Sequence, residues 1–166
     1  MISTNNDALV DAAALQLKFD STLKEVSSRS AAGLLRILVW DYSLRSEDLA
    51  RLLRIPVAAV NMWRSVGDIP SAHQPALAHL VAFLAALEEL PGGMSSPSWL
   101  NREPLQGYAV SAARIWTPER SQVLLQLAAG EADGEDLLDR EIPGWRIQFN
   151  AQSFAARGGD AIFGIH

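Results

Sequence analysis

Cysteine is absent from this 166-residue sequence. Without cysteine the chain has no disulfide framework, no thiolate zinc site and no cysteine nucleophile, and nothing in its composition indicates secretion. The segment from Met1 to Asp7 lacks the basic start and the unbroken apolar stretch of a signal peptide. The longest apolar segment, residues 77–87, is too short to span a bilayer. We therefore expect a cytoplasmic protein.

The motifs of common enzyme classes are also missing. The sequence contains no P-loop, no dinucleotide-binding glycine fingerprint and no nucleophile elbow. His73, His79 and His166 lack the i, i+4 spacing that lets two imidazoles of one helix share a metal ion. The acidic residues within 133–139 lack the alternation of oxygen ligands found in a calcium loop. We predict a binding protein that has no catalytic residues, no cofactor and no metal.

Apolar residues are plentiful, at 49% of the chain, which is enough for one good core or for two small helical modules sharing an interface. They recur mostly at helical spacing, so the predicted fold class is mainly α. A proline- and glycine-rich stretch at residues 91–97 is the clearest boundary. We predict an N-terminal helical region over 1–92, a second helical module over 97–144 and a C-terminal arm over 145–166.

The longest predicted helix begins at Pro75. Its apolar residues form one stripe, which should face the core. The residues of this stripe are Leu77, Leu80, Val81, Leu84 and Leu87.

The C-terminal arm differs in character from the helical regions. Arg146-Ile147-Gln148-Phe149 alternates polar and apolar side chains, as a strand does. Residues 157–160 then form a turn signal before the apolar residues 161–163. This pattern predicts a short β-hairpin or an extended arm.

Two short helices separated by a tight turn are predicted at about 45–66. The Ser46 hydroxyl can cap the first helix, and two acidic residues follow it favourably in the first turn. Pro56 disfavours helical geometry in the residue before it, so a second helix should begin at Pro56 or Val57. Val60 and Trp63 would lie on the buried face of the second helix.

This helix pair lies in a basic part of an acidic chain. The net charge is −5, whereas residues 45–64 carry four arginines and two acidic residues. One basic face on an acidic body is typical of a protein with one anionic and one cationic partner, although ordinary surface variation produces the same pattern.

A helix-turn-helix unit places its second helix in the major groove of DNA. Arginines would then contact phosphates, an alanine could touch a thymine methyl group, and an asparagine could pair with adenine. The candidate DNA-binding residues are Arg45, Arg51, Arg54, Ala58, Asn61 and Arg64. Few exposed positions of the second helix can read a base edge, so a helix pair used only for packing or dimerisation is an alternative.

The helix pair resembles the helix-turn-helix of Xre-type regulators. Ala50 of the first helix, Ile55 of the turn, and Val60 and Trp63 of the second helix fit the residue types of that family. Residues 68–70, Asp-Ile-Pro, resemble the exit from the unit.

The second module resembles the C-terminal toxin-binding domain of Xre-type antitoxins that neutralise RES-domain toxins. The matching features occur in the family's order and are Trp99-Leu100, Pro104-Leu105, Gly107 and Val123-Leu124-Leu125. The chain departs from the family at residues 107–110, where Gly-Tyr-Ala-Val replaces a glycine-arginine-x-proline run. The combined resemblance covers about residues 45–127.

The resemblance implies a type II antitoxin that binds and occludes a cognate toxin, of the NAD-consuming RES type, and represses its own operon through the helix-turn-helix. Aromatic residues and arginines dominate interface energetics. The candidate toxin-binding residues are Trp99, Tyr108, Arg146, Phe149, Arg157 and His166. The alternative for the aromatic residues of the arm is that they close the protein's own core.

A second function fits the same sequence, namely a stand-alone DNA-binding transcriptional regulator whose C-terminal module serves dimerisation. Homodimerisation is expected in either case, because paired helix-turn-helix units read two half-sites.

Overall fold

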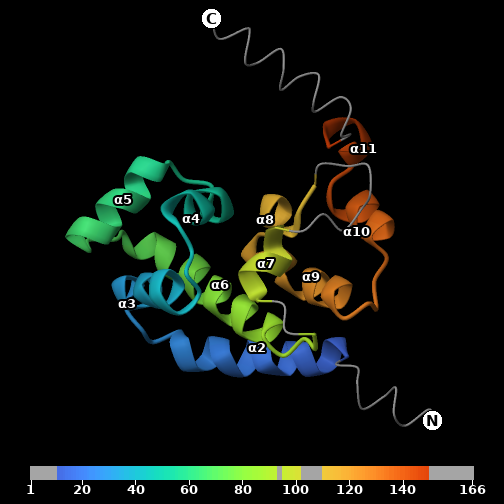
Figure 1. The fold of residues 1–166 in the computed structure, drawn as a ribbon, viewed down its shortest axis with the longest axis horizontal. Coiled ribbons are helices and arrows are strands. Elements are labelled where there is room, and N and C mark those ends of the chain that lie inside the picture. Colours follow the sequence, from blue (N-terminus) through green and yellow to red (C-terminus); the bar gives the residue numbers. More distant parts are fainter. Residues whose placement is uncertain (1–10, 93–94, 102–109, 150–166) are drawn as a thin grey trace, which may run out of the picture.

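The structure is a computed structural model that describes residues 11–92, 95–101 and 110–149. These residues form helices and connecting turns without any strand, which confirms the predicted mainly α fold class (Figure 1). The elements before residue 92 are α2 (Ala12–Val26), α3 (Ala31–Arg36), the π-helix η1 (Ile37–Asp41), α4 (Ser46–Leu53), α5 (Val57–Val66), the 3-10 helix η2 (Ser71–His73) and α6 (Gln74–Leu87). The later elements are α7 (Ser96–Asn101), α8 (Ala112–Ile115), the 3-10 helix η3 (Pro118–Arg120), α9 (Ser121–Ala128), α10 (Gly134–Glu141) and α11 (Trp145–Gln148).

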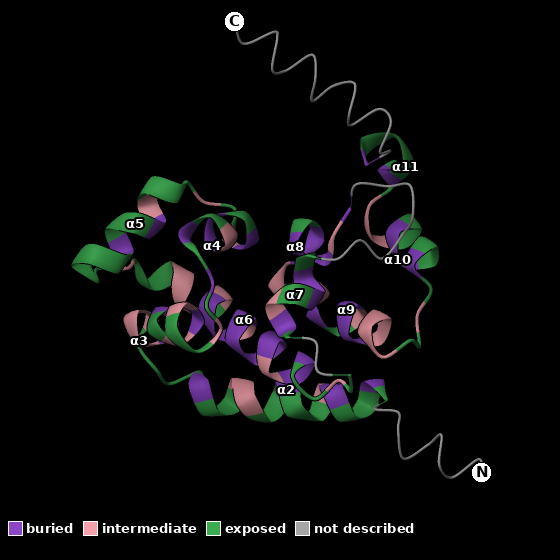
Figure 2. Cartoon of the chain, in the orientation of Figure 1, coloured by how far each residue is buried: buried purple, intermediate pink, exposed green. Residues whose placement is uncertain are grey.

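Helix α6 is the central element, and α2, α3, α7 and α9 pack around it (Figure 1). All five residues of the predicted apolar stripe are buried, as expected. Four further residues on other sides of the helix are also buried, namely Ala78, Ala82, Phe83 and Ala86. A helix that is apolar on all sides is enclosed rather than laid against one face of a core. Figure 2 shows this burial along α6.

The buried residues form one hydrophobic cluster that extends from α2 to Phe149. Phe83 of α6 joins the segments on the two sides of the predicted boundary, because its ring centroid lies 6.2 Å from that of Trp99 and 6.3 Å from that of Trp116. Residues 1–92 and 97–144 therefore share a core in their described parts. The domain boundaries themselves stay a prediction.

The N-terminus of α4 is capped differently from the prediction. Helix α4 begins at Ser46, but the Asp48 carboxylate accepts a 3.0 Å hydrogen bond from the Arg45 backbone N–H, whereas the Ser46 side chain makes no such cap. The Ser46 hydroxyl is buried and accepts a 2.9 Å hydrogen bond from the Arg64 guanidinium. The prediction of a Ser46 cap is thus wrong, because this hydroxyl bonds to α5 instead.

The described part of the C-terminal arm is also different from its prediction. Residues 145–148 form the short helix α11, whereas the alternating side chains predicted a strand. Gly144 adopts a left-handed conformation with φ of 86°, which turns the chain after α10. Asp139 then accepts hydrogen bonds from the Trp145 indole at 2.8 Å and from Arg146 at 2.6 Å. These contacts fold the segment against α10, and the rest of the expected hairpin, residues 150–166, lies outside the described residues.

Candidate functional site

Helices α4 and α5 are two short helices joined by the tight turn that the sequence predicts, and we call them the α4–α5 pair. Arg54 ends α4 in the left-handed conformation, with φ of 56° and ψ of 49°. The Ile55 backbone N–H donates a 3.0 Å hydrogen bond to the Ala50 carbonyl, which closes the turn. Pro56 is the extended N-cap residue, so α5 begins at Val57 as predicted.

The inner face of α5 is anchored by the two residues that the sequence predicts. Val60 and Trp63 are buried, and the Trp63 ring centroid lies 4.8 Å from that of His73. Gly67 ends the helix with φ of 80°, a conformation that glycine adopts without strain. The side of α5 opposite Val60 and Trp63 faces outward, and Figure 2 shows most of this helix as exposed.

The outer face of α5 carries both predicted base-contacting residues, Ala58 and Asn61, which are exposed. Two apolar side chains of this helix are also well exposed, Met62 at 63% and Val66 at 69%. Asn61 therefore supplies a side-chain amide on a face with much apolar surface. Such a face suits protein contact as well as DNA contact.

Arg54 is exposed, but its guanidinium bonds to the second module. Its guanidinium donates hydrogen bonds to the carbonyl of Trp116 at 2.6 Å and to the carbonyl of Arg114 at 3.1 Å. Burial, together with the nearby charge of Arg120, lowers the pKa of Arg54 from its ordinary value. The guanidinium also donates a longer hydrogen bond, 3.4 Å, to the Leu52 carbonyl, and Arg54 would have to give up these hydrogen bonds in order to reach a DNA phosphate.

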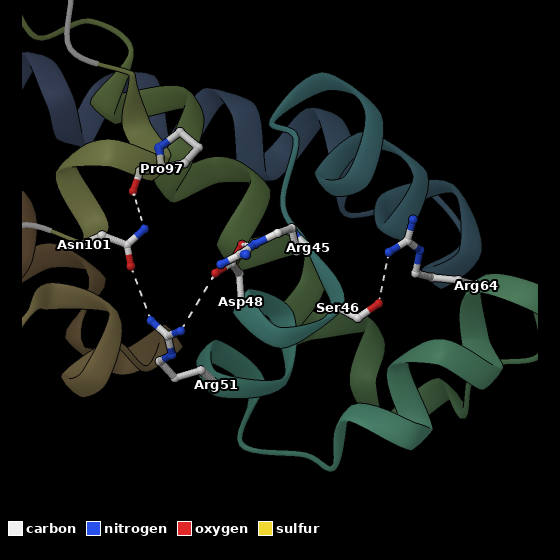
Figure 3. A network of polar contacts seen from close by, with 7 residues as sticks. All are labelled: Arg45, Ser46, Asp48, Arg51, Arg64, Pro97 and Asn101. Atoms are coloured by element: carbon white, nitrogen blue, oxygen red, sulfur yellow. Dashed lines mark hydrogen bonds and ion pairs between the residues drawn. The ribbon is translucent and has the colours of Figure 1, made fainter. Parts of the chain in front are cut away.

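The other three predicted phosphate-contacting arginines are bonded to residues of α4 or α7, and Figure 3 shows their partners. Arg45 approaches Asp48 at 3.3 Å, and this hydrogen bond raises the pKa of Arg45. Arg51 donates to the Asn101 side chain at 3.3 Å and lies 3.9 Å from Asp48. Exposed ion pairs of this kind are weak, so Arg45 and Arg51 can exchange them for a phosphate.

Two predicted toxin-binding residues, Trp99 and Phe149, belong to the core of this protein. Trp99 is 8% exposed and packs on Phe83, whereas Phe149 is 4% exposed with the Arg114 guanidinium 5.1 Å from its ring centroid. Trp145 of the arm is buried as well. In this structure these aromatic side chains close the protein's own core, so Trp99 and Phe149 present little surface to a partner.

Arg146 is the predicted toxin-binding residue with a half-exposed side chain in the described part of the chain. Its guanidinium lies 2.6 Å from Asp139 and 3.9 Å from Glu135, and it stacks 4.5 Å from the centroid of the Trp145 ring. These contacts hold a charged group at the surface in a fixed orientation. Tyr108, Arg157 and His166 lie outside the described residues.

Trp40 is not among the residues predicted from the sequence, and its side chain is 75% exposed on the π-helix η1. It borders a surface pocket that also contains Arg36, Trp63 and Arg64. The sequence does contain one signal for it. Trp40 is a large aromatic residue that lies off the helical spacing of Leu34 and Leu38, so it is expected on the outer side of the helix. Helical spacing could not predict which residues lie near Trp40, because one of them, Arg64, belongs to another helix.

The described segments do not group three or more histidine or acidic side chains closely enough to hold a metal ion. A bilayer-spanning helix, long and apolar enough for that role, is likewise not found in residues 11–92, 95–101 and 110–149.

Comparison with protein-family models, with curated proteins and with solved structures gives no match to this chain.

Proposed function

We propose that this protein is a non-catalytic, cytoplasmic antitoxin whose residues 97–166 bind and occlude a cognate toxin of the NAD-consuming RES type. The observation that supports the proposal is the α4–α5 pair, in which α4 backs an outward-facing α5, on a core shared with the second module. The order of the motifs in residues 99–125, which resembles that of the toxin-binding domain, is the reason for proposing a partner of the RES type.

The mechanism is steric. The antitoxin covers the active site of the toxin and no covalent bond changes, so the affinity must come from surface that the complex buries. Arg146 is suited to this role because its guanidinium is oriented by Asp139 and by the Trp145 ring. Oriented arginines are frequent among the residues that dominate binding energy. Buried Trp99 and Phe149 contribute by fixing the shape of the module.

Co-expression with the protein encoded by the neighbouring reading frame tests this function. That protein, expressed alone, should deplete cellular NAD and arrest growth, and co-expression of the antitoxin should restore both. The purified pair should form a complex of fixed stoichiometry. A neighbour that is harmless alone, or toxicity that the full chain does not relieve, would contradict the proposal.

The second candidate function is a stand-alone DNA-binding regulator, which the outward position of Ala58 and Asn61 on α5 favours. In that case the protein acts as a homodimer on two half-sites. It would bind one duplex sequence specifically, with an affinity that falls steeply as salt rises, and would have no toxin partner. Selection from random duplex DNA, followed by binding at several salt concentrations, distinguishes the two functions.

A further inference from the structure

A surface pocket lies between α3, the π-helix η1 and the C-terminal half of α5. Its volume is about 190 Å³. Leu35 and Trp63, which are nearly fully buried, form apolar parts of its lining, and the exposed indole of Trp40 stands at its edge. Small-molecule sites usually have volumes of about 300–1,000 Å³. This pocket is smaller, so it suits a single large side chain better than a whole cofactor.

The charged groups of the pocket are both cationic. Arg36 and Arg64 line it, and none of its described lining residues is acidic. Within the described residues the Arg36 guanidinium has no ion pair or hydrogen bond, and the hydrogen bond of Arg64 goes to the neutral Ser46 hydroxyl. Asp41 and Asp68 are close in sequence but do not line the pocket. The pocket thus concentrates positive charge on a chain whose net charge is −5.

We propose that this pocket is a docking site for a protein segment that carries a bulky apolar side chain beside an aspartate or glutamate. The apolar side chain would pack between Trp40 and Leu35, and the carboxylate would pair with Arg36. Tryptophan and arginine are the residue types most enriched among those that dominate protein interfaces. A π-helical turn, such as the one that carries Trp40, also occurs frequently at functional sites.

Duplex DNA fits this pocket less well than a protein segment does. Phosphates would pair with Arg36 and Arg64 but would gain nothing from an apolar lining or from the exposed Trp40 indole. The site lies on the N-terminal helices, apart from the module proposed to bind a toxin. It is therefore independent of the antitoxin function, and either inference can fail without the other.

The test is selection of displayed random peptides on the full-length protein, with depletion against a Trp40→Ala variant. The selected peptides should share an aromatic or aliphatic residue next to an acidic one. A synthetic peptide with this sequence should bind at least about tenfold more weakly to Trp40→Ala and to Arg36→Glu, which corresponds to about 1.4 kcal/mol. Replacing its acidic residue by the matching amide should weaken binding similarly.

The matched controls are Leu17→Ala and Lys18→Glu on the exposed side of α2, where Leu17 is 70% exposed, close to the exposure of Trp40. Peptide binding should be unchanged in both controls. Thermal unfolding of each variant shows whether it is folded. If Trp40→Ala is unstable, the comparison of the wild type with Arg36→Glu still tests the proposal. Peptides without an acidic residue, or equal binding by all variants, would overturn the proposal. Duplex DNA binding that Trp40→Ala abolishes, without peptide selection, would overturn it in favour of a nucleic-acid site.

Discussion

The Arg54 guanidinium donates a 2.6 Å hydrogen bond to the backbone carbonyl of Trp116, which lies 62 residues later in the chain. Arg54 is also the left-handed residue that ends α4. One residue therefore makes the turn of the α4–α5 pair and attaches that turn to the second module. The Arg51 hydrogen bond to Asn101 adds a further link between the same two parts.

Replacing Arg54 by alanine should destabilise the protein by about 1–3 kcal/mol, because hydrogen bonds to the carbonyls of Leu52, Arg114 and Trp116 are lost and the partly buried carbonyl of Trp116 is left unpaired. Chemical denaturation of the purified protein measures this change. Arg54→Gly is the informative control, since glycine loses the guanidinium but favours the left-handed backbone. It should be less destabilising than alanine by about 1 kcal/mol. A glycine variant about 1 kcal/mol more stable than the wild type would show that the guanidinium contributes nothing, because only the backbone gain would then remain.

The buried hydrogen bond between Trp116 and Ser121 should also be important for stability. The Trp116 indole N–H donates to the Ser121 hydroxyl at 3.1 Å, and both side chains are buried. Ser121→Ala leaves the indole N–H unpaired and should cost about 1–3 kcal/mol in the free energy of unfolding. Ser65→Ala is the matched control, because Ser65 is exposed. Its change should stay below about 0.5 kcal/mol. Equal effects of the two substitutions would contradict the burial of Ser121.

Contact between α10 and α11 should depend on pH. A hydrogen bond from Arg146, and a second one from Trp145, lower the pKa of Asp139 below its ordinary value of 3.8. A depressed pKa in the folded state means that Asp139 contributes stability at pH values above its unfolded pKa. That contribution is complete above a pH of about 5 and is lost as the pH falls through the folded pKa. An NMR titration of the Asp139 carboxyl group should give a midpoint below 3.8.

Arg146→Ala serves as the comparison for this titration. The variant lacks the principal cause of the shift, so the Asp139 midpoint should move upward. The same midpoint in both proteins would mean that Arg146 does not pair with Asp139 in solution.

Asn61 should determine base preference if the α4–α5 pair binds DNA. After a duplex site has been selected, Asn61→Ala should reduce discrimination for adenine at one position by about 1–3 kcal/mol. Arg45→Ala should instead weaken binding to all sequences alike. It should also reduce the slope of the logarithm of affinity against the logarithm of salt concentration by about 1, the value expected for one lost phosphate contact. Leu17→Ala, on a different helix, should change neither property. A loss of affinity in Asn61→Ala without a change in base preference would rule out direct readout by this residue.

The local parts of the fold could be predicted from sequence because their causes lie within a few residues. Pro56 separates α4 from α5 through its effect on the residue before it, and helical spacing places Val60 and Trp63 on the buried face. The stripe on α6 was predicted for the same reason. Its other sides are buried by α2, α7 and α9, which a single-helix pattern does not reveal.

The remaining contacts depend on residues far apart in the chain. Ser46 has the side chain of a helix cap, but Arg64 from the next helix occupies its hydroxyl. Arg54 has a side chain suited to binding phosphate, but its guanidinium donates a hydrogen bond to the Trp116 carbonyl instead. The alternation at residues 146–149 is local and still gave the wrong element, because Asp139 binds Trp145 and Arg146. Side-chain type thus indicated which chemistry was available at each position, whereas tertiary packing decided its use.

The most direct test of the antitoxin proposal is affinity purification of the full-length protein from its native cells, with nuclease treatment to remove partners bridged by DNA, followed by mass spectrometry. The proposal predicts a stoichiometric protein partner that depletes NAD when it is expressed alone. Specific enrichment of DNA, with no stoichiometric protein partner, would contradict it and identify the chain as a transcriptional regulator.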